Sequence, residues 1–92
     1  MVKIPFHLIR TNMGRQGLEI VFPYRNQWYR LDWDKTPDRF KELYVVWLKL
    51  QGKEIPNYLK KWETVMIDVE NVNIEINLAE CEEIPETYPL GA

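Results

Sequence analysis

Few side chains in this sequence could act as nucleophiles, bases or metal ligands. The chain contains no serine, one histidine, His7, and one cysteine, Cys81. This composition excludes hydrolysis by a Ser-His-Asp triad and a zinc site built from several Cys or His ligands. Cys81 and His7 could form a nucleophile–base pair, but Glu80 and Glu82 flank the cysteine, and their charge should raise the pKa of its thiol. We therefore expect no catalytic residues.

Carboxylates are the other groups that could support catalysis, as ligands of the metal ions of a nuclease. Two-metal chemistry requires carboxylates that converge within a few ångströms. Asp32 and Asp34 are close in sequence, but Asp34 comes just before a predicted helix start. Asp68, Glu70 and Glu75 fall in a predicted hairpin, with Glu70 in its turn. The sequence therefore predicts a protein that is not an enzyme and that holds no metal and no cofactor.

The clearest element that could position a binding site is a β-hairpin over residues 18–33. A turn at Arg25-Asn26 is predicted, because Asn26 tolerates the left-handed backbone of such turns. The pairs on one face are then Leu18–Trp33, Ile20–Leu31 and Phe22–Tyr29. The opposite face carries Glu19, Val21, Pro23, Trp28, Arg30 and Asp32. Because proline cannot donate a ladder hydrogen bond, Pro23 should lie at an edge or a bulge.

Two segments flank this hairpin. Upstream, the alternation of Ile4, Phe6 and Leu8 predicts a first strand, followed by a loose basic connection over residues 12–17. Downstream, Thr36-Pro37-Asp38 is typical of a helix start, with Thr36 as the cap, and Gly52 of a C-terminal cap. The apolar stripe of this helix is Phe40, Leu43, Tyr44, Trp47 and Leu50. A second, shorter helix is predicted from Pro56 to Trp62.

Residues 64–78 alternate in a way that predicts a second hairpin. The apolar positions change parity at Glu70-Asn71, so a turn there keeps them on one face. The expected pairs are Val69–Val72, Ile67–Ile74 and Val65–Ile76. We therefore predict an α+β fold with a mainly antiparallel sheet, the order β-β-β-α-α-β-β, and the helices packed on one face. Residues 1–78 would form a single domain, and residues 79–92 an acidic, extended C-terminal tail.

Charge is unevenly distributed along the chain. Residues 1–61 hold all 12 Lys and Arg against six acidic residues, whereas residues 62–92 hold eight acidic residues and no Lys or Arg. This asymmetry indicates a basic surface for a polyanionic or acidic partner, and an acidic segment that could cover it. The sequence has no apolar run of roughly 20 residues and no signal peptide, and its single cysteine cannot form an internal disulfide. A cytoplasmic protein without a membrane segment is expected.

Aromatic and basic residues are interleaved on the outer face of the first hairpin and its flanks. Cations neutralise phosphates while aromatic rings stack on bases, so this combination is typical of nucleic-acid-binding surfaces. Trp28 is the strongest candidate contact, since it is the tryptophan that we expect to be exposed. We expect Trp33 and Trp47 to lie in the core and Trp62 to be half-buried. The predicted contact residues are Tyr24, Arg25, Trp28 and Arg30, with Arg10, Arg15 and Lys35 on phosphates.

Residues 17–50 resemble the arm-type DNA-binding domain of phage-like tyrosine recombinases. The resemblance rests on residues 17–25, on Tyr29-Arg30-Leu31 and on the helix that follows. In that family a three-stranded sheet enters the major groove and a helix supports it from behind. The resemblance implies that Tyr24, Arg25 and Arg30 lie on the DNA-facing sheet. Asn26 stands where the family has a turn glycine, and the acidic second hairpin has no counterpart there.

Two functions remain open from the sequence. The first is a small non-catalytic protein that binds nucleic acid through the basic and aromatic hairpin face. The second is a protein-binding inhibitor, adaptor or immunity-type module that acts through Trp28 or the acidic C-terminal surface. The tail could be merely solubilising, could compete for the basic surface, or could itself bind a basic partner. Homodimerisation through the edge that contains Pro23 is also open.

Overall fold

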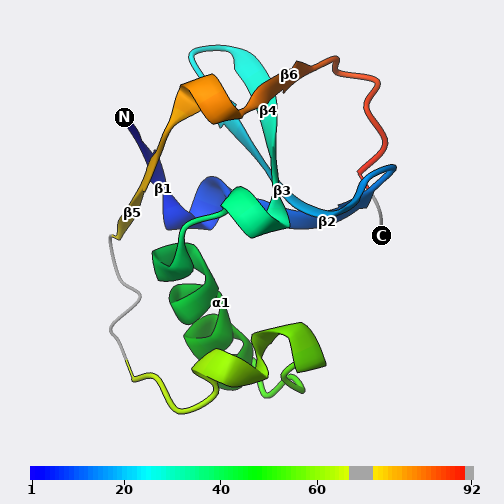
Figure 1. The fold of residues 1–92 in the computed structure, drawn as a ribbon. Coiled ribbons are helices and arrows are strands. Elements are labelled where there is room, and N and C mark those ends of the chain that lie inside the picture. Colours follow the sequence, from blue (N-terminus) through cyan, green and yellow to red (C-terminus); the bar gives the residue numbers. More distant parts are fainter. Residues whose placement is uncertain (67–71, 91–92) are drawn as a thin grey trace.

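The computed structural model describes residues 1–66 and 72–90 (Figure 1). The larger of two antiparallel sheets has the strand order β2-β3-β4-β6. Its strands are β2 (Arg10–Gly14), β3 (Gly17–Tyr24), β4 (Gln27–Asp32) and β6 (Glu82–Ile84). The smaller sheet pairs β1 (Val2–Pro5) with β5 (Asn73–Ile76). The helix α1 (Asp38–Leu50) follows the central hairpin, and the 3-10 turns are η1 (Phe6–Leu8), η2 (Trp33–Lys35), η3 (Asn57–Trp62) and η4 (Leu78–Glu80).

The predicted α+β class with antiparallel strands is confirmed, but the predicted order of elements is wrong. Within the described residues there are two sheets instead of one, and α1 is the only α-helix. The second predicted helix is the 3-10 segment η3, which begins directly after Pro56 and buries Leu59 against α1. The core lies between both sheets and the first turns of α1, and its buried residues are Ile4, Ile9, Ile20, Phe22, Leu31, Phe40, Leu43, Ile74 and Ile76.

The central hairpin has the predicted register. Ile20 lies opposite Leu31 and Phe22 opposite Tyr29, although Trp33 begins η2 and lies beyond the end of the ladder. Hydrogen-bonded and non-bonded pairs alternate along an antiparallel ladder, so Pro23 directs its nitrogen away from β4. On that side the pairing of β2 with β3 ends at Val21. Pro23 therefore occupies an edge position, as expected.

The turn of this hairpin contains two residues with a left-handed backbone. Arg25 has φ 48° and Asn26 has φ 63°. Asparagine adopts this conformation readily, whereas arginine does so at a cost of about 1 kcal/mol. We expect Arg25→Asn to raise the free energy of unfolding by about 1 kcal/mol. Urea denaturation measures the change, and Arg25→Ala, which keeps the backbone cost, should give no gain. Equal stability of both variants would contradict this explanation.

The second predicted hairpin is wrong where the structure describes it. Ile74 pairs with Ile4 and Ile76 with Val2, so β5 joins the N-terminal strand. The turn and the other strand expected over residues 67–71 lie outside the described residues. Pairing with β1 places Ile74 and Ile76 in the main core beside Ile4, which explains why this partner is preferred.

Two further segments near the N-terminus differ from the prediction. Residues 12–17, expected as a loose connection, contain the end of β2 and a two-residue turn into β3. The first strand ends at Pro5, and Phe6 to Leu8 form η1. This turn redirects the chain from the small sheet to the large one (Figure 1).

The ends of α1 follow the sequence signals only in part. Gly52, with φ 69°, ends the helix, and the amide of Lys53 donates to the Leu48 carbonyl at 3.0 Å, which is a Schellman cap. Thr36 does not cap α1; its hydroxyl donates to the Asp32 carbonyl oxygen at 2.9 Å. Leu50, expected in the apolar stripe, is 69% exposed. The helix instead uses Val45 and Leu48 against η3.

Candidate functional site

The outer face of the large sheet holds a buried cluster of charged residues. Arg30 has a side chain only 7% exposed, and its guanidinium donates to three carboxylates. Its Nε lies 2.6 Å from Glu19 Oε1, and its Nη1 lies 2.9 Å from Glu82 Oε2. Its Nη2 donates to Asp32. Desolvation lowers the pKa of Arg30, but these carboxylates outweigh it and raise the pKa, so Arg30 stays charged.

Glu19 is the centre of this cluster and is fully buried. Besides Arg30, the side-chain amide of Asn12 and the hydroxyl of Tyr88 each donate to Glu19 Oε2 at 2.7 Å. Burial by itself raises the pKa of Glu19, but the hydrogen bonds from Tyr88, Arg30 and Asn12 outweigh it and lower the pKa below its ordinary value. Gly14 completes the site, since a Cβ at this position would overlap the Glu19 carboxylate.

The C-terminal segment covers this face. Residues 79–92 were expected as an extended tail outside the domain, but β6 pairs with β4, with Ile84 opposite Trp28 and Glu82 opposite Arg30. The chain then loops back from β6 toward the β2–β3 end of the sheet, where Tyr88 reaches Glu19 (Figure 1). Ile84 is only 5% exposed. In the described residues the tail is therefore an integral layer of the fold.

This layer overturns two expectations about the hairpin face. Arg30 is not exposed, because Glu19 and Glu82 hold its guanidinium beneath the tail. Trp28 is half-buried, because Ile84, Pro85 and Tyr88 line the same recess. Trp33 and Trp47, expected in the core, are also only half-buried, as is Trp62, which was expected to be so.

The other predicted contact residues do not gather on one surface patch. Arg15 lies in the β2–β3 turn, Lys35 ends η2, and Arg25 lies at the hairpin tip with its guanidinium 5.3 Å from the centre of the Tyr24 ring. Tyr24 is half-buried, whereas the four cations Arg10, Arg15, Arg25 and Lys35 are exposed. Only Arg10 contributes to the groove described next.

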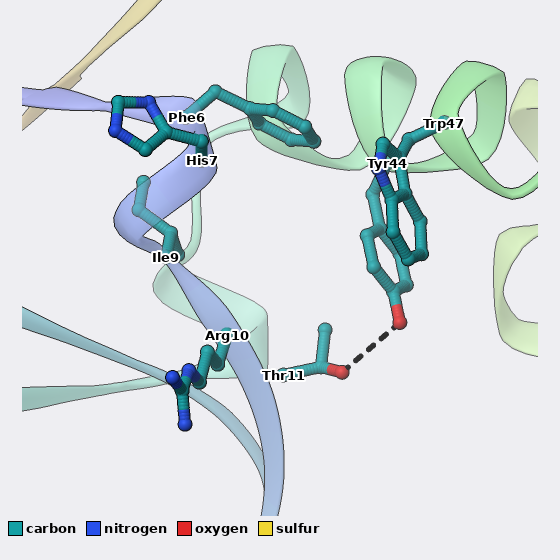
Figure 2. Close-up of a pocket in the computed structure, with 7 residues that line it drawn as sticks. All are labelled: Phe6, His7, Ile9, Arg10, Thr11, Tyr44 and Trp47. Carbon is teal, nitrogen blue, oxygen red and sulfur yellow. Dashed lines mark hydrogen bonds between the residues drawn. The ribbon is translucent and has the colours of Figure 1, made fainter.

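A groove of about 400 Å³ lies between the start of β2 and the helix α1 (Figure 2). Arg10 and Thr11 come from β2, and Tyr44 and Trp47 come from α1. Thr11 Oγ1 and the Tyr44 hydroxyl share a hydrogen bond of 3.2 Å across it. The complete lining is Phe6, His7, Ile9, Arg10, Thr11, Tyr44 and Trp47. Among the residues that the structure describes, this lining is mostly apolar and includes no carboxylate.

The aromatic wall of this groove is one continuous stack along α1. The rings of Phe40 and Tyr44 are 5.6 Å apart, and those of Tyr44 and Trp47 are 5.9 Å apart, nearly parallel in both pairs. The Lys53 ammonium lies 5.4 Å from the centre of the Trp47 ring. The spacing of these rings at i, i+4 and i+7 is visible in the sequence, but we interpreted it only as a core stripe. Two of these rings, Tyr44 and Trp47, line the groove instead.

The candidate chemical groups do not form a catalytic arrangement in the described residues. Burial, and then the charge of Glu80, raises the pKa of Cys81 to about 11, so its reactive thiolate is scarce at neutral pH. The thiol donates to the Asn77 carbonyl oxygen at 3.6 Å, and His7 lines the groove. Over residues 1–66 and 72–90 no group of three His, Cys, Asp or Glu side chains is placed to hold a metal ion. Asp68 and Glu70 lie outside this range.

Comparison with protein-family models, with curated proteins and with solved structures gives no match. The resemblance of residues 17–50 to the arm-type domain of tyrosine recombinases therefore stays a prediction. None of the helices in the described ranges is long and apolar enough to cross a bilayer; α1 has 13 residues.

Proposed function

We propose that this chain is a small, non-catalytic protein-binding module, and that the groove between β2 and α1 is its contact site. The observation that carries this proposal is an open, largely apolar groove with a stacked aromatic wall and the cations Arg10 and Lys53 beside it. Aromatic side chains and arginine are enriched at the centres of protein interfaces. Because Phe40, Tyr44 and Trp47 stack on one another, the groove needs little ordering when a partner binds.

The groove favours a protein over a nucleic acid for two reasons. Lys53 covers the outer face of the Trp47 ring, and Tyr44 is stacked on both sides, so a base would meet ring edges. In addition, Arg30 was a predicted nucleic-acid contact, but its buried guanidinium forms an ion pair with Glu19. It is therefore not free to bind a phosphate. We also propose that the protein is cytoplasmic, since its single cysteine cannot form an internal disulfide.

Affinity capture with a charge-reversal pair tests this function. Arg10 contributes to the groove lining and is exposed, so Arg10→Glu should leave the fold intact and remove most of the captured partner. Arg39 is also exposed, on α1 but outside the groove lining, so Arg39→Glu is the matched control. We expect one protein at near-stoichiometric yield, insensitive to nuclease, retained by Arg39→Glu. Capture that is equal for both variants would reject the groove as the contact site.

Nucleic-acid binding is the second candidate, supported by the four exposed cations, Arg10, Arg15, Arg25 and Lys35. The contact would centre on the hairpin tip, where the Arg25 guanidinium lies over Tyr24. A titration of duplex and single-stranded oligonucleotides across salt concentration tests it. Two or three phosphate contacts predict an affinity that falls with a slope of roughly −2 in log–log form, and that weakens in Arg25→Glu. Absence of binding at low salt would reject this candidate.

A further inference from the structure

The strand β2 has one side that no other strand occupies in the described part of the chain. It is the first strand in the order β2-β3-β4-β6, and its other neighbour in space is α1, across the groove. A strand edge presents backbone donors and acceptors that can pair with another chain. Natural proteins commonly shorten, charge or cover such edges. Here the edge carries Met13, which is 67% exposed, so it is not shielded by a polar side chain at that position.

The register of the β2–β3 hairpin identifies which backbone groups face outward. The two-residue turn at Arg15-Gln16 makes Gly14 and Gly17 a hydrogen-bonded pair. Since bonded and non-bonded pairs alternate, Asn12 also bonds to β3. Thr11 and Met13 fall on the non-bonded pairs, so their N–H and C=O groups point away from β3. In the described part of the chain, two donors and two acceptors therefore point outward along this edge.

The groove lies directly beside these groups. Thr11 shares a hydrogen bond with Tyr44, so α1 reaches under the open edge of β2 (Figure 2). Side chains of a strand alternate between its two faces. A strand added beside Thr11 and Met13 would therefore turn every second side chain toward Tyr44 and Trp47. An apolar side chain there would enter the space of about 400 Å³ between sheet and helix.

The charge around this edge selects the chemistry of the added strand. Arg10 and Arg15 lie near the two ends of β2 and are exposed, and Lys53 lies over Trp47 at the helix side. Within residues 1–66 and 72–90, no Asp or Glu contributes to the groove lining. Rim charges of this kind favour a partner of opposite sign and increase its association rate.

We propose that an acidic, extended segment of a partner protein binds by adding a strand to the open edge of β2. Its apolar side chains occupy the groove against Tyr44 and Trp47, and its carboxylates, on the opposite face of the added strand, lie nearer Arg10 and Arg15. This mode is β-strand addition, in which main-chain hydrogen bonds supply affinity and side-chain pockets supply specificity. The inference rests on the proposed protein-binding function and specifies the form of the partner.

The probe is the peptide selected from an unbiased phage-displayed library of peptides about ten residues long. We expect the enriched sequences to alternate apolar and acidic residues. Amide hydrogen exchange of the complex should slow at Thr11 and Met13 by at least about tenfold, because these amides gain partners. The backbone amide of Asn12 already faces β3, so it is the internal control, and its exchange rate should not change. Arg10→Glu should weaken the peptide roughly tenfold, and Arg39→Glu should not.

N-methylation of the peptide separates this inference from the proposed function. Methyl groups on the alternate amides that face β2 should abolish binding, whereas methyl groups on the intervening amides should be tolerated. A peptide that responds to Arg10→Glu but not to either methylation pattern would overturn strand addition and leave the groove as a protein contact. Enriched peptides rich in Lys or Arg would overturn the charge assignment. A failed selection, or peptides indifferent to Arg10→Glu, would overturn the inference, and the capture experiment then decides on the function separately.

Discussion

Replacing Arg30 with methionine is expected to lower the free energy of unfolding by about 3–5 kcal/mol. The guanidinium is the only cation that contacts the fully buried Glu19 carboxylate within the described residues, and without it that charge stays buried and uncompensated. For a chain of this length such a loss shifts the unfolding temperature by about 12 °C or more. Urea or thermal unfolding followed by tryptophan fluorescence measures it.

Two further variants identify the cause. The double variant Glu19→Gln with Arg30→Met should recover a large part of the loss, because removing both charges leaves no unpaired ion. Arg39→Met removes an exposed arginine of the same size and should change stability by less than about 0.5 kcal/mol. A double variant as unstable as Arg30→Met alone would mean that lost packing, and not the unpaired carboxylate, explains the effect.

The same cluster predicts opposite pH dependences for the native chain and the variant. In the native chain the pKa of Glu19 is lowered, so its contribution to stability is complete above its ordinary pKa and is lost as the pH falls below it. In Arg30→Met, burial without a cation raises that pKa, so the folded state takes up a proton more readily than the unfolded state. We therefore expect the variant, unlike the native chain, to gain stability as the pH falls from about 7 toward about 5.

Ending the chain after residue 80 should have the second large effect, a loss of at least about 4 kcal/mol. The truncation removes β6 with the buried Ile84, and it removes the Tyr88 hydroxyl that donates to Glu19. Chemical denaturation of both lengths measures the difference.

Point variants divide this loss between its sources. Ile84→Ala should account for about 2–5 kcal/mol through lost burial. Tyr88→Phe keeps the ring and removes one hydrogen bond to a charged group, which is worth about 1.5–3 kcal/mol. Glu86→Ala, an exposed change in the same segment, is the control. If the truncated chain were as stable as the full chain, the tail would be an appendage, as the sequence suggested.

The sequence was informative where local signals determine the structure. The hairpin register follows from alternation between apolar and polar residues together with the turn at Arg25-Asn26, and both are local. The strand β2 was missed because Arg10, Thr11 and Asn12 carry no apolar alternation, as befits an edge. The partner of β5 was predicted wrongly because pairing depends on which distant segment offers a matching apolar face.

The candidate site was harder to predict because it depends on a second layer. Strand alternation correctly put Glu19, Arg30 and Asp32 on one face, but it could not show that the C-terminal segment covers that face. Ile84 and Tyr88 were the apolar and aromatic signals within an otherwise acidic tail. On α1, the charged residue Lys41 is buried, with its ammonium 4.9 Å from the centre of the Trp33 ring. Its aliphatic stem allows this burial.

The ladder between β1 and β5 has a consequence for the order in which the molecule assembles. Val2 pairs with Ile76, so the two strands can meet only after residues 2–76 have been synthesised. Closing so long a loop carries an entropic penalty that local hairpins avoid. The β2–β3–β4 meander can therefore form early, while Ile4 stays exposed to solvent until Ile74 pairs with it. Newly made chains would be most prone to self-association during that interval.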